Sequence, residues 1–320
     1  MQCALLFCLC LREFPPPLST AVVCTLTFVN FDISFYRSFS LIRIHTRTQY
    51  AQCALHVTTF HAQHMYRLTN LRTLDLSKNS IQRLDPKYGQ LKNLKSLNLD
   101  GNKLTGGPAV AVIAKLTKLQ NLSLGGNVLG RFTITNSNSA PTSSSSSNKN
   151  AKEVLPTPLP PSLKQLSLNG NFLSNVPRSI VSVQPYLNKL EKLDLSSNQL
   201  ASIPTDVVNL VKLIELNLDN NVIVSLPTEI GSLQNLKQLS LRNNHITVTS
   251  TNFDKNPQPL PPTLFTDTPL IDLNLHGNPM ASTQLNSFVG YDKFLERRQQ
   301  VKTNALLGGA LTNLDVCGLE

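Results

Sequence analysis

Tryptophan is absent from the chain, and aromatic residues make up only 6% of its 320 residues. Leucine instead dominates the hydrophobic residues, which form 41% of the chain. That content is ample for a continuous core, and it excludes a disordered or a fibrous protein. Because one aliphatic shape supplies most of that core, the composition is typical of a protein built from repeats.

Cysteine is missing from residues 54–316, so a disulfide framework is not expected there. The apolar run in residues 1–11 has no basic residue before it and no clear cleavage site, which makes it a poor signal peptide. A second apolar stretch, residues 18–35, barely reaches the length of a membrane span and carries Asn30 and Asp32. We therefore expect neither a signal peptide nor a transmembrane helix.

Catalytic signatures are also missing. The chain contains no GxSxG, GxxxxGK[ST] or HExxH motif and no glycine-rich dinucleotide loop. One cluster has metal-like spacing, namely Cys53, His56, His61 and His64, but it lacks the paired signature of a zinc site. We predict a protein that is not an enzyme and that needs no metal and no cofactor.

No run of like charge stands out, although the formal net charge is +10 and the isoelectric point is about 9.4. The basic residues are spread along the chain from Arg12 to Lys302. A basic surface would favour acidic partners only if the charge were gathered in one place. We expect it not to be gathered, and we expect no nucleic-acid partner.

The chain does contain an internal repeat. The pattern LxxLxLxxNxL, with another aliphatic residue allowed at the end, occurs eight times. Its copies begin at Leu71, Leu94, Leu119, Leu163, Leu190, Leu213, Leu236 and Leu270. Its asparagines are Asn79, Asn102, Asn127, Asn171, Asn198, Asn221, Asn244 and Asn278. A repeat of this kind and period is the signature of a leucine-rich-repeat solenoid.

The spacing explains why such a chain folds. In each copy the residues of the LxL core alternate in direction, so the leucines face the interior and the residue between them faces outward. The asparagine follows the strand, where its amide can bond to unpaired backbone groups of adjoining turns. The sequence predicts an α/β fold, with a curved parallel sheet on the concave face and short helices and loops on the convex face.

The repeats define the expected domain organisation. Residues 1–64 show neither repeat nor capping helix, and an incorrect gene model would explain them. The solenoid spans residues 65–281, with a serine-rich loop at 131–152 and a proline-rich, irregular insertion at 249–268. Residues 282–300 read as an amphipathic capping helix and 301–320 as a tail. Lys293, Arg297 and Arg298 fit either simple capping or contact with acidic lipid.

The concave face is where we expect a partner to bind. Its outward strand positions carry six acidic residues and two basic ones, so this face is acidic in a basic protein. Those positions and one histidine form the candidate site: Asp75, Asp100, Lys192, Asp194, Glu215, Asp219, Arg242, Asp272 and His276. The acids fit the attraction of a basic partner surface, and they equally fit a sheet that is merely kept soluble.

Two segments resemble a known family. The repeat Leu71–Asn79 and the segment Gly290–Arg297, which reads GYDKFLER, resemble intracellular Ras-group leucine-rich-repeat proteins of the leucine-rich repeat-containing protein 57 family. The resemblance covers about residues 68–298 and implies a small non-catalytic protein. Animal members typically begin Met-Gly, which is consistent with myristoylation. Gln2 follows Met1 here, so that lipid anchor is not carried over.

We therefore expect a cytoplasmic interaction scaffold in signalling, monomeric, with a protein partner and with membrane association unsupported by a lipidation motif. An extracellular or membrane-tethered recognition module is the alternative. Cys3, Cys8, Cys10 and Cys24 loosely resemble the N-terminal cysteine cap of extracellular leucine-rich-repeat proteins. Such a cap would normally adjoin the first repeat, and here more than forty residues intervene.

Overall fold

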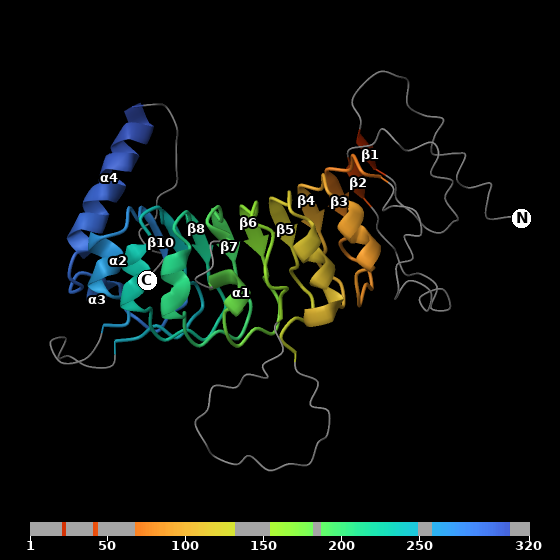
Figure 1. Ribbon diagram of the computed structural model, residues 1–320. Helices are drawn as coiled ribbons and strands as arrows, with labels where there is room; N and C mark the ends of the chain where they lie inside the picture. The colour runs from red at the N-terminus through yellow and green to blue at the C-terminus, as the bar shows by residue number, and fades with distance from the viewer. Residues whose placement is uncertain are drawn as a thin grey trace, which may run out of the picture.

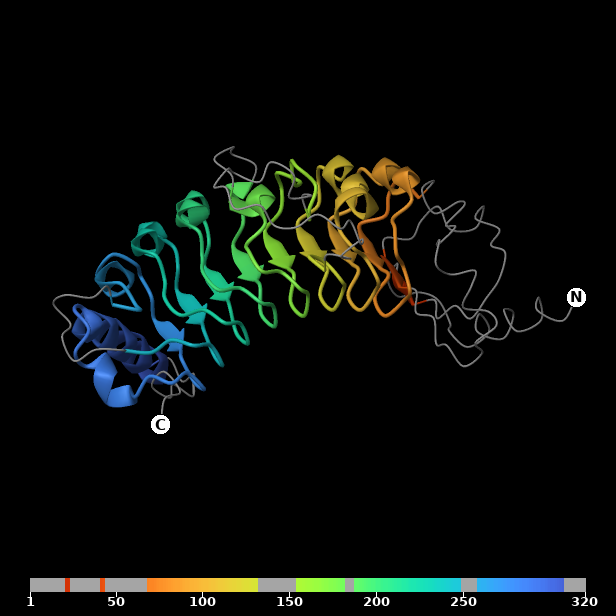
Figure 2. The same ribbon diagram turned by 90° about the horizontal axis from the view of Figure 1, so that it is seen from below.

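The protein is a curved stack of coils, each made of one short strand and a return segment (Figures 1 and 2). The computed structural model describes residues 21–23, 41–43, 68–131, 154–181, 187–248 and 258–307. Its sheet has ten parallel strands in chain order. They are β1 (Ala21–Val23), β2 (Leu41–Arg43), β3 (Thr73–Asp75), β4 (Ser96–Asn98), β5 (Asn121–Ser123), β6 (Gln165–Ser167), β7 (Lys192–Asp194), β8 (Glu215–Asn217), β9 (Gln238–Ser240) and β10 (Asp272–Asn274).

The return segments carry short helices, which lie on the outer side of the arc while the strands line the inner side (Figure 2). They are η4 (Pro86–Gln90), η5 (Gly107–Ala109), η6 (Ala111–Lys115), α1 (Arg178–Val181), η8 (Thr205–Asn209), η9 (Thr228–Ser232) and α2 (Pro262–Thr266). Pro204 and Pro227 precede η8 and η9 with φ of −69° and −73°, which the proline ring favours. The predicted fold class is confirmed.

The core is a continuous column of leucines. Leu193 and Leu195, on either side of Asp194, are only 3% and 1% exposed. Leu193 pairs in register with Leu166 on one side and with Leu216 on the other, so the same side chain stacks on itself from coil to coil. Burying one leucine contributes about 1.5–3 kcal/mol, and the stack repeats that contribution in every coil.

Each strand ends in a tight turn that requires a left-handed residue. That residue comes directly before the repeat asparagine, and its φ is positive in all eight repeats. The residues are Lys78, Gly101, Gly126, Gly170, Ser197, Asn220, Asn243 and Gly277. This conformation costs a residue with a side chain about 1–2 kcal/mol. Four repeats have glycine at this position, and four have a residue whose side chain makes the conformation costly. The packing of the coils therefore imposes the turn, whatever the preference of the residue.

The repeat asparagines stabilise this turn. The Nδ2 of Asn198 donates to the carbonyl of Leu195 in its own coil at 2.9 Å and to that of Leu168 in the preceding coil at 3.0 Å. Its Oδ1 accepts the N–H of Leu173 at 3.1 Å. The same arrangement recurs from Asn102 to Asn278. Each of these amides therefore joins two coils.

The structure extends the sheet further toward the N-terminus than we predicted. Strands β1 and β2 lie within residues 1–64, and β2 pairs in parallel with both β1 and β3. Thr27 and Arg47 stand where the repeat would place its asparagine, and this is why the pattern missed both strands. The other residues from 1 to 67 lie outside the described residues.

The proline-rich insertion is only partly irregular. Residues 249–257 lie outside the described residues, but α2 is helical and buries Leu264 and Phe265. The prediction was wrong here because Pro261 and Pro262 stand at the start of the helix, where a missing N–H is tolerated. The serine-rich loop, apart from Arg131, lies outside the described residues.

The C-terminal cap consists of α3 (Ser282–Leu285) and α4 (Tyr291–Leu307), so it ends later than the predicted residue 300. Tyr291 and Phe294 pack on the buried ring of Phe265, with centroids 5.6 and 6.1 Å away. Val289, which lies within the predicted capping segment, is 60% exposed and does not contribute to this packing.

Arg297 fastens α4 to the last coil. Its Nη2 donates to the carbonyl of Phe265 at 2.7 Å and its Nε to that of Leu270 at 3.2 Å. Burial lowers the pKa of the Arg297 guanidinium, and the neighbouring Glu296 partly offsets that effect. Arg298 is also buried, whereas Lys293 is exposed. Arg297 and Arg298 therefore serve the cap.

Replacing Asn198 with alanine should lower the free energy of unfolding by about 1–3 kcal/mol, because it leaves buried backbone groups of two coils unpaired. Urea denaturation followed by circular dichroism measures the change. Asn175→Ala is the control, since Asn175 is exposed and, among the described residues, its side chain bonds only to its neighbour Ser174. Its effect should stay within about 0.5 kcal/mol. Equal losses in both variants would contradict the assigned role of Asn198.

Replacing Arg297 with alanine should loosen the cap, at a cost of about 1–3 kcal/mol for two bonds from a charged donor. Amide hydrogen exchange should then speed up first in α4 and α2. Lys293→Ala, on the exposed side of the same helix, should leave exchange unchanged. If both variants exchange alike, Arg297 does not fasten the helix.

Candidate binding surface

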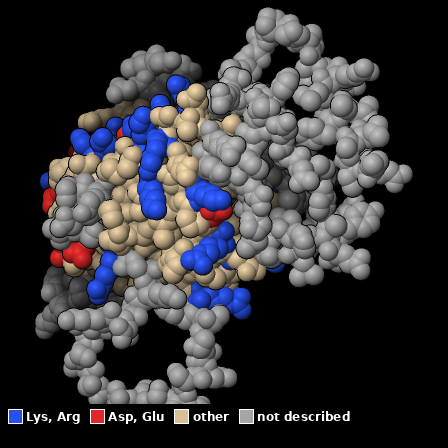
Figure 3. All heavy atoms as spheres, turned by 45° about the vertical axis from the view of Figure 1, so that its right-hand side comes forward, with Lys and Arg blue, Asp and Glu red and all other residues tan. Residues whose placement is uncertain are grey.

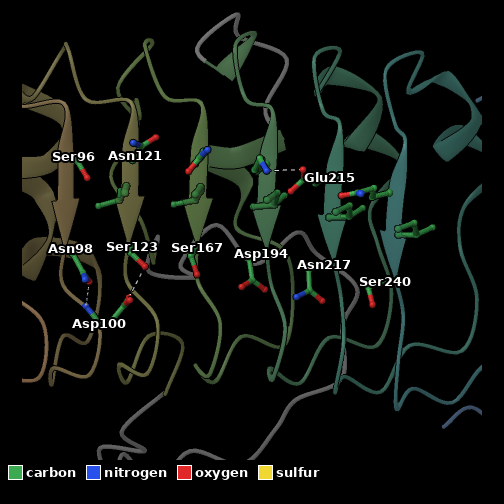
Figure 4. A pocket seen from close by; sticks show the side chains of 18 of the residues that line it. Ser96, Asn98, Asp100, Asn121, Ser123, Ser167, Asp194, Glu215, Asn217 and Ser240 are labelled. Atoms are coloured by element: carbon green, nitrogen blue, oxygen red, sulfur yellow. Dashed lines mark hydrogen bonds and ion pairs between the residues drawn. The ribbon is translucent and has the colours of Figure 1, made fainter. Parts of the chain in front are cut away.

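The inner face of the sheet forms an open groove of about 590 Å³. Residues from β4 to β10 line it. Polar side chains make up most of this lining, and the central leucines of the same strands complete it (Figure 4). Because the residue between two inward leucines always faces this side, the repeat itself places one polar row along the groove. Side chains on paired strands are held in a fixed register, so the groove presents a regular polar surface.

Five of the nine predicted site residues line this groove, namely Asp100, Lys192, Asp194, Glu215 and Asp272. The other four, Asp75, Asp219, Arg242 and His276, are not among its lining residues. Asp75 is only 7% exposed. Asp219, Arg242 and His276 each come after the end of their strand, so the groove takes mainly the predicted residues that lie within the strands.

Two of the acids bind the next coil. Asp100 Oδ1 accepts from Ser123 Oγ at 2.7 Å and from the N–H of Gly125 at 2.6 Å (Figure 4). Asp219 Oδ1 accepts from Ser240 Oγ at 2.6 Å and from the N–H of Arg242 at 2.7 Å. All these donors are neutral, so each carboxylate keeps its charge while it joins two coils.

A third acid, Asp194, stabilises its own turn. Its Oδ1 accepts from the N–H of Ser196 at 3.0 Å and from Ser196 Oγ at 2.7 Å. Asn98 and Asn217, at the same strand position, make the equivalent backbone bond to Asp100 and Asp219. An amide oxygen therefore serves this turn as well as a carboxylate does.

The positive charge of Lys192 is balanced by Glu215 on the neighbouring strand. Its Nζ lies 2.6 Å from Glu215 Oε1, and both side chains are partly exposed, at 47% and 36%. A surface pair of this kind adds about 0–1 kcal/mol to stability, so its main effect is on charge. Four lining carboxylates against this one ammonium leave the groove with a net charge of −3.

Gly125 and Asn169 are outward positions that are not among the nine predicted site residues. A Cβ on Gly125 would collide with Asn169 Oδ1, an atom that accepts from Ser167 Oγ at 2.9 Å. Glycine at this point lets Asn169 fold over the preceding coil and lets Asp100 reach the N–H of Gly125. The signal in the sequence was the one position without a side chain in a column that is otherwise polar.

Within the part of the chain that the structure describes, no three His, Cys, Asp or Glu side chains are grouped to hold a metal ion. The Cys53, His56, His61 and His64 cluster lies outside the described residues. No described helix combines the length and the hydropathy that a membrane crossing needs.

Known proteins share both the repeat and the fold. Residues 56–104, 69–129 and 188–246 match the family described as leucine rich repeat. Osteomodulin from Bos taurus is 34% identical over 151 residues, which are 46% of this chain and 29% of that protein. Podocan-like protein 1 from Mus musculus is 29% identical over 161 residues, which are 42% of this chain and 24% of that protein. The chain thus matches less than half the length of these curated relatives.

Solved structures agree on the architecture. A leucine-rich-repeat protein from Leptospira interrogans superimposes with a TM-score of 0.55 at 26% identity, over 80% of this chain and 65% of that one. An internalin from Listeria monocytogenes shares the fold, with a TM-score of 0.52 at 20% identity, over 80% of this chain and 60% of that one. The likeness is to leucine-rich-repeat proteins in general, and the Ras-group resemblance rests on sequence motifs alone. The matched repeats and the parallel sheet show that this chain has the fold of a leucine-rich-repeat solenoid.

Proposed function

We propose that the protein is a non-catalytic scaffold that binds a partner protein in the groove between β4 and β10. The observation that carries the proposal is a row of polar side chains on a rigid sheet with a net charge of −3, in a chain whose formal charge is +10. Opposite charge across an interface speeds encounter and selects partners more than it adds affinity. A basic partner surface therefore fits this groove.

The dimensions of the groove indicate what can occupy it. Seven strands spaced about 4.8 Å apart span roughly 29 Å. A helix rises 5.4 Å per turn, so roughly five turns fit along the groove. We infer that the partner presents one basic helix or an extended segment of similar length.

Intracellular signalling is part of the proposal, and the motif GYDKFLER supports it. Gly290 has a φ of +83°, Tyr291 and Phe294 pack on Phe265, and Arg297 bonds to the last coil. The motif thus has a physical task, namely closing the stack. A shared cap of this kind favours the intracellular Ras-group resemblance, and we propose a cytoplasmic location.

An extracellular recognition module is the second candidate, favoured by Cys3, Cys8, Cys10 and Cys24 and by the likeness to osteomodulin. Thiol alkylation of the protein in its native cells, followed by mass spectrometry, separates the two. Free thiols at these cysteines would support the cytoplasmic location, and disulfides among them would support the extracellular one.

Neutralising the groove should weaken partner binding by about tenfold or more, which corresponds to about 1.4 kcal/mol. The variant is Asp194→Asn, Glu215→Gln and Asp272→Asn, which removes three charges and keeps the acceptor that Asp194 offers to Ser196. Partners are first recovered by affinity capture from cells, and the affinity of each purified partner is then measured by calorimetry.

The matched control removes three charges from the convex side, by Asp206→Asn, Glu229→Gln and Asp267→Asn. It should bind as the unaltered protein does. Thermal melting must show all three proteins folded. A partner whose affinity is the same in all three, or falls equally in both variants, would refute the groove as its site.

Asp219, which lies outside the groove and joins two coils, should affect stability. Asp219→Ala should lower the free energy of unfolding by about 1–3 kcal/mol, because the N–H of Arg242 and the hydroxyl of Ser240 lose their acceptor. Asp219→Asn should recover most of that loss, since an amide oxygen can accept the same bonds. Chemical denaturation of both variants checks this, and equal losses in the two would contradict it.

A further inference from the structure

The structure gathers basic side chains that are far apart in the sequence. The residues just before each strand stack in register, as the backbone bonds from Lys95 to Arg72, from Gln120 to Lys95 and from Lys164 to Gln120 show. This edge of the solenoid carries six exposed lysines, which we name the strand-start ridge: Lys92, Lys95, Lys118, Lys189, Lys212 and Lys237. Our expectation that the charge is not gathered was wrong, because the coil period brings these positions together.

The charge of the ridge is not compensated locally. Lys92 Nζ donates to the carbonyl of Lys115 at 3.0 Å and Lys118 Nζ to Asn93 Oδ1 at 2.8 Å, and both acceptors are neutral. Of the acids near this edge, Glu191 and Glu215 are paired with Lys164 and Lys192. Asp272, whose N–H donates to the carbonyl of Lys237, forms no ion pair with another described residue. None of the six ridge lysines forms an ion pair with another residue in the described ranges.

The composition of the ridge indicates its partner. Protein interfaces favour arginine and aromatic residues and are depleted in lysine. Nucleic-acid surfaces without sequence preference use aromatic side chains for stacking, and residues 92–95, 117–120, 188–191, 211–214 and 234–237 contain none. Lysine is a compact, strongly hydrated charge on a flexible stem. A row of lysines alone is suited to attraction across a layer of water.

The shape of the ridge also fits attraction across a layer of water. From β4 to β9 the lysines extend over about 24 Å along one side of the arc, and they are not among the residues lining the groove. Val211 on the same edge is 48% exposed, and its carbonyl accepts from Asn235 Nδ2 at 2.7 Å. On the face drawn in Figure 3, Lys and Arg side chains outnumber Asp and Glu. The ridge is thus an extended charged edge without a pocket.

We propose that the strand-start ridge binds the surface of an anionic lipid membrane. Each lysine near such a surface strengthens binding by about fivefold, and the attraction fades within a Debye length of about 8 Å at physiological ionic strength. The groove lies on the face of the sheet, whereas the ridge lies along the edge where the strands begin. A solenoid that rests on this edge therefore leaves the groove open. The proposal is independent of the partner in the groove.

Vesicle sedimentation of the full chain tests the ridge. The probes are vesicles of phosphatidylcholine alone and of phosphatidylcholine with 30% phosphatidylserine. We expect binding that requires phosphatidylserine and that weakens as salt is raised. Lys189→Gln, Lys212→Gln and Lys237→Gln together should lower the partition coefficient by on the order of 100-fold.

The control variant removes the same charge from the opposite edge, by Lys78→Gln, Lys103→Gln and Arg131→Gln. It should change binding by only a few-fold. Circular dichroism melting must show both variants folded. The proposal is overturned if phosphatidylserine does not increase binding, or if both variants lose binding equally. Ridge-dependent binding to a single-stranded oligonucleotide that exceeds ridge-dependent binding to the vesicles would likewise overturn it.

Discussion

The solenoid depends on how the backbone is satisfied where each three-residue strand ends. The chain turns there through a left-handed residue, and the turn leaves carbonyl and N–H groups inside the stack. The asparagine amide meets two carbonyls and one N–H at once, as Asn198 does for Leu195, Leu168 and Leu173. A side chain with only an acceptor or only a donor could not do this. Leucine burial supplies the driving force, but the amide determines where each coil turns.

The repeat asparagine also determined which strands could be predicted from the sequence. Strands β3 to β10 follow from alternation and from the asparagine spacing, because both are local. Strands β1 and β2 lack the asparagine, so their membership of the sheet shows only in their pairing with β3. The helix at Pro262 was hidden because prolines usually signal irregular chain, and here they stand at its start.

The binding surface was predictable to the level of its polarity, but not to the level of individual roles. Alternation identified the outward acids, whereas the bond from Asp100 to the coil of Ser123 depends on which residue stacks next to it. The pairing of Lys192 with Glu215 and the closeness of Gly125 to Asn169 have the same origin. The gathering of lysines on one edge is also a property of stacking. Such contacts between neighbouring coils can be predicted only when the repeats are aligned, so that residues that stack on one another stand in one column.

The aromatic packing of α4 on the last coil bears on how copies of this protein meet one another. Tyr291 and Phe294 pack on Phe265, the leucines of the last coil are buried, and Arg297 donates to two carbonyls at that end. A bare final coil would offer its strand and its apolar side chains as a template for another chain. Because α4 packs on that end, it disfavours head-to-tail growth into a filament there.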